Sequence, residues 1–417
     1  MKLELNHNSI MAIRKNRFWD SIMEMAKIGP GKSGGSNRQA LTDEDNQGRE
    51  LFCRWCKEAG LAISVDQMGT IFATREGTEP DLPGVYIGSH LDTQPTGGKF
   101  DGVLGVVAAL EVVRTLNEYQ VKTKRSIIVT NWTNEEGSRF VPSMLASAVF
   151  SGVYSLEYAY GLKDREGITL HHELKRTGWL GTEPVGARKI HSYVEYHIEQ
   201  GPILESKHKS VGVVTHCQGQ SWLEVTLTGR SAHTGSTPMN MRKNACLAMA
   251  RIINIVDDIA MKLQPNVAGS VGQINMLPNS RNALPETAIF TIDLRAVDKD
   301  KFITLCELVE TEVQKIAQEH NVLCSIERIG HYEPIEFDKQ ITEVVKNSAI
   351  QLGYDFMEIT SGAGHDATWI SGVAPTSMIF CPCVDGISHH ESEDITQEWA
   401  ESGANVLLHT AITLSNA

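Results

Sequence analysis

Three short segments of the chain concentrate side chains that bind divalent cations. His90 and Asp92 stand in Gly-Ser-His-Leu-Asp, Asp101 stands in Phe-Asp-Gly, and Glu135 and Glu136 stand side by side in Asn-Glu-Glu-Gly. An imidazole combined with carboxylates suits Zn²⁺, Mn²⁺, Co²⁺ or Ni²⁺ better than Mg²⁺ or Ca²⁺, which prefer shells of oxygen alone. These residue types therefore predict a site for a cation of the first kind.

Two further segments carry histidines, His197 in Tyr-His-Ile-Glu-Gln and His389 in Ile-Ser-His-His-Glu. Two metal ions about 3.5–4 Å apart that share one carboxylate need about five protein ligands. The five candidates are His90, Asp101, Glu136, His197 and His389. Glu135 is then left over, and a carboxylate beside the ligands stands where a general base would act on water.

Asp92 stands two residues after His90, so on a strand the two side chains point to the same side. We expect its carboxylate to accept the second N–H of the His90 imidazole, the usual support for a metal-binding histidine. His390 and the pair His365 and Asp366 are rival ligands. Their alternative role is polar lining of the same cleft.

The elements that must position these residues follow from the hydrophobic pattern. Apolar runs at residues 84–91 and 126–132 predict strands, and the spacing of apolar residues from Val103 to Leu116 predicts a helix between them. This strand–helix–strand order favours parallel pairing. In an open α/β sheet, ligands bind outside the carboxyl ends of the parallel strands, which is where the three segments stand.

The pattern changes between residues 218 and 332 to strand, helix, strand, strand, helix, strand. This is the order of a ferredoxin-like α+β sandwich. We therefore expect residues 1–217 and 333–417 to form one discontinuous α/β domain into which residues 218–332 are inserted. A glycine-rich stretch at residues 29–36, GPGKSGGS, predicts an exposed loop, with a binding loop as the alternative.

Composition narrows the possible partners and the compartment. The 417 residues include 38 Lys and Arg against 51 Asp and Glu, a net charge of −13, which argues against nucleic-acid and acidic-membrane surfaces. No apolar window is long enough to span a bilayer, and the start of the sequence lacks the features of a signal peptide. We expect a cytoplasmic protein whose eight scattered cysteines form no disulfide framework.

Six stretches resemble, in the same order, the amidase and carbamoylase branch of the dinuclear metallopeptidase M20 superfamily. They are GSHLDTQPTGGKFDGVLGVVAALEVVRTL, TNEEGSRF, HIEQGP, SAHTGSTPM, SGAGHDA and GISHHESE. The resemblance runs from about residue 29 to about residue 400. It implies a dinuclear-metal aminopeptidase-like α/β/α catalytic domain, with the inserted ferredoxin-like domain acting as a lid and as a dimerisation domain.

The resemblance also implies a role for each matching residue. The two divalent metal ions would be held by His90, Asp101, Glu136, His197 and His389, with Asp101 bridging. Glu135 would be the general base, and Asp92 is counted with it among the catalytic residues. Zinc is the first expectation, with manganese, cobalt or nickel as alternatives. Peptidase members usually have a carboxylate at the position of His197, so this histidine favours the amidase branch.

Four further residues match positions that face the substrate in the resembling enzymes. Arg295 offers a planar fork for a carboxylate, Asn282 can pair with it, and His233 can donate to the oxyanion that forms on the attacked carbonyl. Gln200 would bind the amide or carboxylate end of the substrate. The inserted domain, which carries three of the four, is expected to close over the cleft or to come from a neighbouring subunit.

The implied reaction removes the carbamoyl group of an N-carbamoyl amino acid and yields the free amino acid, carbon dioxide and ammonia. The substrate would be an N-carbamoyl-L-amino acid or N-carbamoyl-β-alanine. An allantoate amidohydrolase, or an aminoacylase or dipeptidase on the same scaffold, is the alternative. The expected partners are this small substrate and a second copy of the chain bound through the inserted domain, with no nucleic acid and no membrane.

Overall fold

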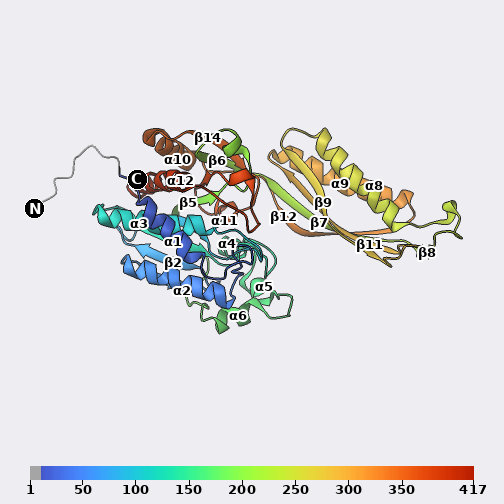
Figure 1. Ribbon diagram of the computed structural model, residues 1–417, viewed down its shortest axis with the longest axis horizontal. Coiled ribbons are helices and arrows are strands. Elements are labelled where there is room, and N and C mark those ends of the chain that lie inside the picture. Colours follow the sequence, from blue (N-terminus) through green and yellow to red (C-terminus); the bar gives the residue numbers. More distant parts are fainter. Residues whose placement is uncertain (1–10) are drawn as a thin grey trace, which may run out of the picture. The chain divides into compact units, whose positions relative to one another are not determined.

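The computed structural model describes residues 11–417, which divide into two compact units (Figure 1). The larger unit comprises the chain up to Thr215 and from Phe337 onward, and the inserted unit comprises residues 216–336. The corresponding borders drawn from the sequence were 218 and 332. Residues 1–10, which the sequence analysis assigns to the larger domain, lie outside the described residues.

A mixed sheet forms the centre of the larger unit, with the strand order β1-β2-β4-β3-β5-β15-β6-β13 and β14 paired to β6. The central strands β4, β3, β5 and β15 run parallel, whereas β1 with β2, β2 with β4, β15 with β6 and β6 with β13 pair antiparallel. The parallel pairing predicted for β3 and β4 is therefore confirmed. The strands are β1 Ala62–Val65, β2 Ile71–Arg75, β3 Gly84–His90, β4 Ile127–Trp132, β5 Ile190–Ile198, β6 Val211–Cys217, β13 Ile335–Glu336, β14 Phe356–Ser361 and β15 Thr376–Cys381.

Helices cover both faces of this sheet, as strand β5 illustrates. Val194 and Tyr196 point into the core beneath α3 and α12, and the Tyr196 hydroxyl donates to the carbonyl of Ala400 in α12 at 3.1 Å. Glu195 faces the other way and accepts the backbone N–H of Ala367 in α11 at 2.9 Å. The alternation gives the α/β/α layering predicted from the resemblance. The helices are α1 Lys15–Met25, α2 Asp43–Glu58, α3 Val103–Glu118, α4 Leu145–Phe150, α5 Leu156–Gly161, α6 Leu170–Arg176, α7 Ile203–Ser206, α10 Lys339–Leu352, α11 Asp366–Ile370 and α12 Gln397–Ser415.

Helix α3 lies unusually close to the sheet because of a glycine in its first turn. A Cβ atom on Gly105 would lie 2.2 Å from the carbonyl oxygen of Tyr196 in β5. Only glycine permits this approach. The amino terminus of α3 is thereby held at the carboxyl ends of the parallel strands, where the predicted ligands stand.

The inserted unit has a four-stranded antiparallel sheet with the order β12-β7-β11-β9. Numbered within the unit, this order is fourth, first, third, second, which is the ferredoxin-like arrangement predicted from the sequence. Helices α8 and α9 pack against the sheet through a separate apolar core. A two-stranded sheet, β8 with β10, lies beyond the end at which β11 begins (Figure 1). The elements are β7 Gly219–Thr228, β8 Ala232–His233, α8 Ala245–Lys262, β9 Val267–Leu277, β10 Ala283–Leu284, β11 Thr287–Ala296, α9 Lys299–Glu319 and β12 Leu323–Tyr332.

All eight cysteines are free thiols, and most of them are buried. Within residues 11–417, no helix has the length and apolar character that a bilayer crossing requires.

Candidate metal centre

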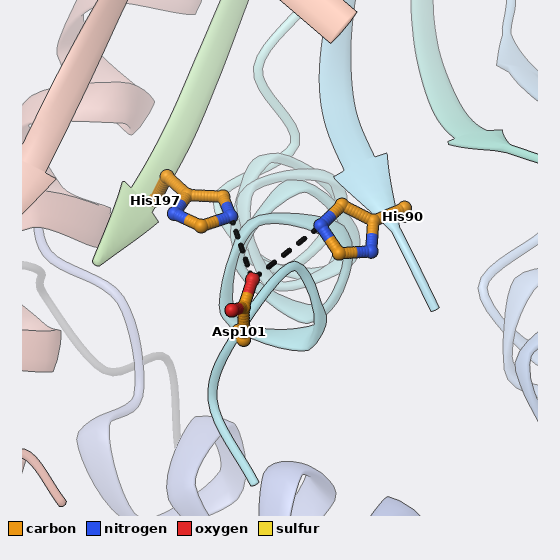
Figure 2. A group of neighbouring side chains, drawn as sticks. All are labelled: His90, Asp101 and His197. Carbon is orange, nitrogen blue, oxygen red and sulfur yellow. Dashed lines mark ion pairs between the residues drawn. The ribbon is translucent and has the colours of Figure 1, made fainter. Parts of the chain in front are cut away.

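The predicted ligands of the larger unit come together at the carboxyl ends of three parallel strands. His90 is the last residue of β3, His197 is the penultimate residue of β5, and Glu135 and Glu136 follow the end of β4. Asp101 directly precedes Gly102, the N-cap of α3. Figure 2 shows how His90 and His197 point toward Asp101 from either side.

A first donor group consists of His90, Asp101 and His197, all of which are buried. Nε2 of His197 lies 3.1 Å and Nε2 of His90 lies 3.5 Å from the same Asp101 oxygen, Oδ1 (Figure 2). One atom from each residue lies within 4.8 Å of the others. Three donors converging in this way could hold one cation.

A second donor group consists of Asp101, Glu136 and His389. Nε2 of His389 lies 3.4 Å from Asp101 Oδ2 and 3.4 Å from Glu136 Oε2. The side chain of His389 is 53% exposed, so this group opens to solvent while the first is enclosed. Asp101 offers one oxygen to each group, which is the arrangement that a bridging carboxylate between two cations requires.

Backbone carbonyls fix the two buried imidazoles so that Nε2 faces Asp101. Nδ1 of His90 donates to the carbonyl of Asp92 at 2.9 Å, and Nδ1 of His197 donates to the carbonyl of Ile198 at 2.9 Å. Since a carbonyl only accepts, the proton sits on Nδ1 and the lone pair of a neutral ring sits on Nε2. Nε2 of His90 is buried and has no hydrogen-bond partner among residues 11–417, which fits a position reserved for a cation.

The electrostatics of the cluster favour added positive charge. Burial disfavours the charged form of His90, yet the carboxylates of Glu135 and Asp101 raise the pKa of this imidazole well above its usual range. Burial, reinforced by Asp101, also raises the pKa of Glu136 well above normal. Asp101 differs, because burial raises its pKa but the adjacent imidazoles of His197 and His90 outweigh this effect and hold the pKa well below the usual range. Divalent cations would supply the positive charge that compensates for these buried carboxylates.

Glu135 lies beside the donor groups and belongs to neither of them. Its Oε2 is 3.5 Å from Nε2 of His90. Burial, together with the nearby carboxylates of Asp366 and Glu136, raises the pKa of Glu135 well above its usual range. A buried carboxyl group with a raised pKa is suited to taking up and releasing a proton.

Asp92 supports the site in a different way from the one predicted. Its carboxylate accepts the backbone N–H groups of Glu135 and Glu136, both at 3.2 Å, while its backbone carbonyl receives the N–H of His90. The prediction assumed strand geometry, but β3 ends at His90 and Asp92 lies in the following loop. The Asp92 carboxylate therefore orients the glutamate pair instead of the imidazole.

Glycine after Asp101 is required by the packing of the ligands. Gly102 has φ +67°, and a Cβ atom there would lie 2.4 Å from the ring of His90. Its N–H points at Nε2 of His197 at 3.2 Å. Any side chain at this position would displace one of the two buried imidazoles.

Gln200, predicted to contact substrate, points at the second donor group. Its Nε2 lies 3.0 Å from Asp101 Oδ2, 3.2 Å from the hydroxyl of Ser388 and 3.3 Å from Nε2 of His389. Gln94 was not foreseen by sequence reasoning. Both its backbone N–H and its side-chain amide donate to Glu136, at 3.1 and 2.7 Å. The sequence feature that could have identified Gln94 as a site residue is its place in the loop that follows His90.

The rival ligands lie near the site but belong to neither donor group. Nδ1 of His390 is 2.7 Å from the hydroxyl of Ser392. The ring of His365 packs against that of His197, with centroids 4.5 Å apart, and its Nε2 meets the hydroxyl of Ser361 at 3.1 Å. Asp366 accepts the hydroxyl of Ser147.

The predicted substrate residues of the inserted unit separate into two places. His233 in β8 is paired with Ala283 in β10, and the N–H of Thr234 donates to the carbonyl of Asn282 at 3.0 Å, so His233 and Asn282 are neighbours. Arg295 stands near the far end of β11, where its guanidinium is held by the carboxylate of Asp293 at 3.0 Å. The structure therefore brings two of the three together and sets Arg295 apart.

Comparison with known proteins places this chain in a family. Residues 86–413 match the model of peptidase family M20/M25/M40. The chain is 60% identical over 400 residues to the N-carbamoyl-L-amino-acid amidohydrolase of Rhizobium meliloti, covering 96% of each chain. It is 30% identical over 424 residues to the ureidoglycolate hydrolase of Arabidopsis thaliana, covering 99% of this chain and 89% of that one.

Among solved structures, an amidase of the hydantoinase/carbamoylase family from Burkholderia multivorans superimposes with a TM-score of 0.90 at 47% identity. The match covers 98% of this chain and 99% of that one. The chain therefore belongs to peptidase family M20/M25/M40, and it is a hydrolase that acts on carbon–nitrogen bonds other than peptide bonds.

Proposed function

We propose that this enzyme removes the carbamoyl group from N-carbamoyl-L-amino acids, with two divalent metal ions held by the two donor groups. The sharing of Asp101 between these groups is the observation that carries the proposal. A ureido carbonyl is flanked by two nitrogens and is a poor electrophile, so its hydrolysis needs strong polarisation. The activity named for the Rhizobium meliloti relative supports the same class of substrate.

The chemistry of the donors indicates which ions fit. The first donor group combines two imidazoles with a carboxylate, and the second combines one imidazole with two carboxylates. Mixed sets of this kind suit zinc, manganese, cobalt or nickel, and zinc is our first choice. Two such ions would polarise the ureido carbonyl and lower the pKa of a water molecule.

Glu135 is assigned as the general base. It takes a proton from the attacking water and returns it to the amino nitrogen of the product as the bond between that nitrogen and the carbamoyl carbon breaks. The carbamate that leaves then decomposes to carbon dioxide and ammonia. Asp92 assists by holding the backbone N–H groups of Glu135 and Glu136, so both carboxylates keep their directions.

The substrate residues are assigned by the chemistry of their side chains. Gln200 lies against the solvent-exposed His389, where an entering substrate would meet its amide. Arg295, oriented by its pairing with Asp293, is assigned to the substrate carboxylate. His233 and Asn282, neighbours beside the β8–β10 sheet, are assigned to the carbonyl oxygen as it gains negative charge.

The length of β11 bears on how these residues reach one substrate. The strand separates the β10 end, next to Asn282, from Arg295, and eight steps from Thr287 to Arg295 span about 26 Å at 3.3 Å per residue. A small amino acid derivative cannot touch both ends of one such strand. This supports a homodimer in which one inserted unit supplies Arg295 to a site and the partner supplies His233 and Asn282.

Substrate and metal can be tested together by measuring ammonia release. Chelated protein should be inactive, and about two zinc, manganese or cobalt ions per chain should restore release of ammonia from N-carbamoyl-L-amino acids. N-Carbamoyl-β-alanine, allantoate, ureidoglycolate and an N-acetyl-L-amino acid are run in parallel. Full activity without metal, or preference for one of these four compounds, would contradict the proposal.

The different roles proposed for Glu135, as general base, and Glu136, as metal ligand, give a second test. Glu135→Gln should keep both metal ions but lose kcat by about a hundredfold or more, because only the proton carrier is removed. Glu136→Gln makes the same chemical change one residue away and should lose the metal of the second donor group. Metal content and kcat are measured for both variants, and identical behaviour would show that the roles are wrongly assigned.

Arg295→Lys tests the carboxylate anchor, because it keeps the charge but loses the planar fork. KM for an N-carbamoyl-L-amino acid should rise about tenfold or more with metal content unchanged. Arg328→Lys is the matched control, since Arg328 also pairs with a carboxylate of the inserted unit, Glu310 at 2.6 Å. A substrate amidated at its carboxyl group should be poor for the parent and little worse for Arg295→Lys. Equal discrimination by parent and variant would mean that another group binds the carboxylate.

A further inference from the structure

Glu393 is a buried carboxylate that holds the loop of the shared ligand. The residue is 4% exposed. Its Oε1 accepts the backbone N–H groups of Phe100 and Asp101, both at 3.1 Å. Its Oε2 accepts the hydroxyl of Ser388 at 3.0 Å. These hydrogen bonds of the Glu393 side chain are therefore directed at the loop that carries Asp101 and at the segment that carries His389.

The loop before Asp101 is shaped to receive this carboxylate. A Cβ atom on Gly98 would lie 2.0 Å from Oε1 of Glu393, so the backbone passes directly over the carboxylate and only glycine fits. Both backbone N–H groups meet the same carboxylate oxygen, Oε1. Two such bonds at adjacent residues fix the position of the peptide from which the Asp101 side chain departs.

Ser388 gives Glu393 a second connection to the same ligand. Its hydroxyl lies 3.0 Å from Glu393 Oε2 and 3.3 Å from Asp101 Oδ2, so it sits between the two carboxylates. Oδ2 is the Asp101 oxygen that faces the second donor group. A displacement of Glu393 would therefore move the Ser388 hydroxyl and with it a contact of Asp101 Oδ2.

His389 depends on the same segment. It follows Ser388 directly, its φ of +54° is unusual for a residue with a side chain, and its imidazole is half exposed. An exposed ligand receives little support from packing, so its position is set mainly by the backbone that carries it. Glu393 ties this backbone to the loop of Asp101 from four residues away.

From these contacts we propose that Glu393 is a positioning residue, which sets Asp101 Oδ2 against His389 and thereby determines affinity for the metal of the second donor group. The inference rests on the two-metal function proposed above. It assigns to Glu393 no contact with substrate or metal. The first donor group, whose histidines are buried on β3 and β5, should depend on Glu393 much less.

Glu391 provides a matched control in the same segment. Its carboxylate accepts the backbone N–H groups of Ser33 and Gly35 in the glycine-rich loop at residues 29–36. This loop contributes no residue to either donor group. Removing the Glu391 carboxylate therefore disturbs a neighbouring loop to a similar degree while leaving the contacts to Asp101 in place.

The test is titration of the metal-free proteins with zinc, followed by calorimetry or by competition with a chromogenic chelator. The parent should bind two ions. Glu393→Ala and Glu393→Asp should bind the first ion as the parent does and the second about 10- to 100-fold more weakly, the usual effect of losing a support for a ligand. Glu393→Gln keeps an oxygen for the two N–H groups, so it should stay within about threefold of the parent.

Glu391→Ala should bind both ions like the parent. Thermal unfolding of each metal-free variant shows whether it folds, and Glu393→Asp serves if the alanine variant does not. Parent-like binding of the second ion by Glu393→Asp or Glu393→Ala would overturn the inference. The inference would also be overturned if Glu391→Ala lost as much affinity for the second ion as Glu393→Ala does. It would likewise be overturned if Glu393→Gln lost as much of this affinity as Glu393→Asp. A parent that binds fewer than two ions would instead contradict the proposed function.

Discussion

The carboxylate of Asp101 gives one oxygen to each of two donor groups, and much of the larger unit is organised around this division. Gly102 has no side chain, which lets the rings of His90 and His197 approach the carboxylate. Gly105 brings α3 down onto β5, so the residue before the helix meets the ends of the strands. The parallel centre of the sheet supplies the two buried histidines from strands on either side of the helix axis (Figure 2).

The cluster around Asp101 places several carboxylates close together in a buried site, where their negative charge needs compensation. Asp101, Glu135 and Glu136 lie within one buried cluster, and burial raises the pKa of both glutamates. Desolvated carboxylates are costly unless a cation or several hydrogen bonds compensate for the lost water. Two divalent ions would compensate for this cost. The same ions would bring a polarised carbonyl and a water molecule to the Glu135 carboxylate, so one cluster of carboxylates explains both the need for cations and the proposed hydrolysis.

Sequence reasoning succeeded where local patterns and strand ends decide the structure. The strands ending near His90 and Trp132, the helix from Val103 and the ferredoxin-like order of the inserted unit could all be predicted from periodicity. The partner of the Asp92 carboxylate was predicted wrongly, because alternation no longer holds once β3 has ended. The contacts of Glu393 with residues 100 and 101 join segments almost 300 residues apart in the chain, and no local pattern reveals such a pairing.

The central claim is that two metal ions share Asp101, and anomalous X-ray scattering from crystals of the zinc-loaded protein tests it most directly. The account predicts two peaks about 3.5–4 Å apart, one beside His90 and His197 and the other beside Glu136 and His389, with the Asp101 carboxylate between them. A single peak at full zinc occupancy, or a second peak that Asp101 does not touch, would contradict it.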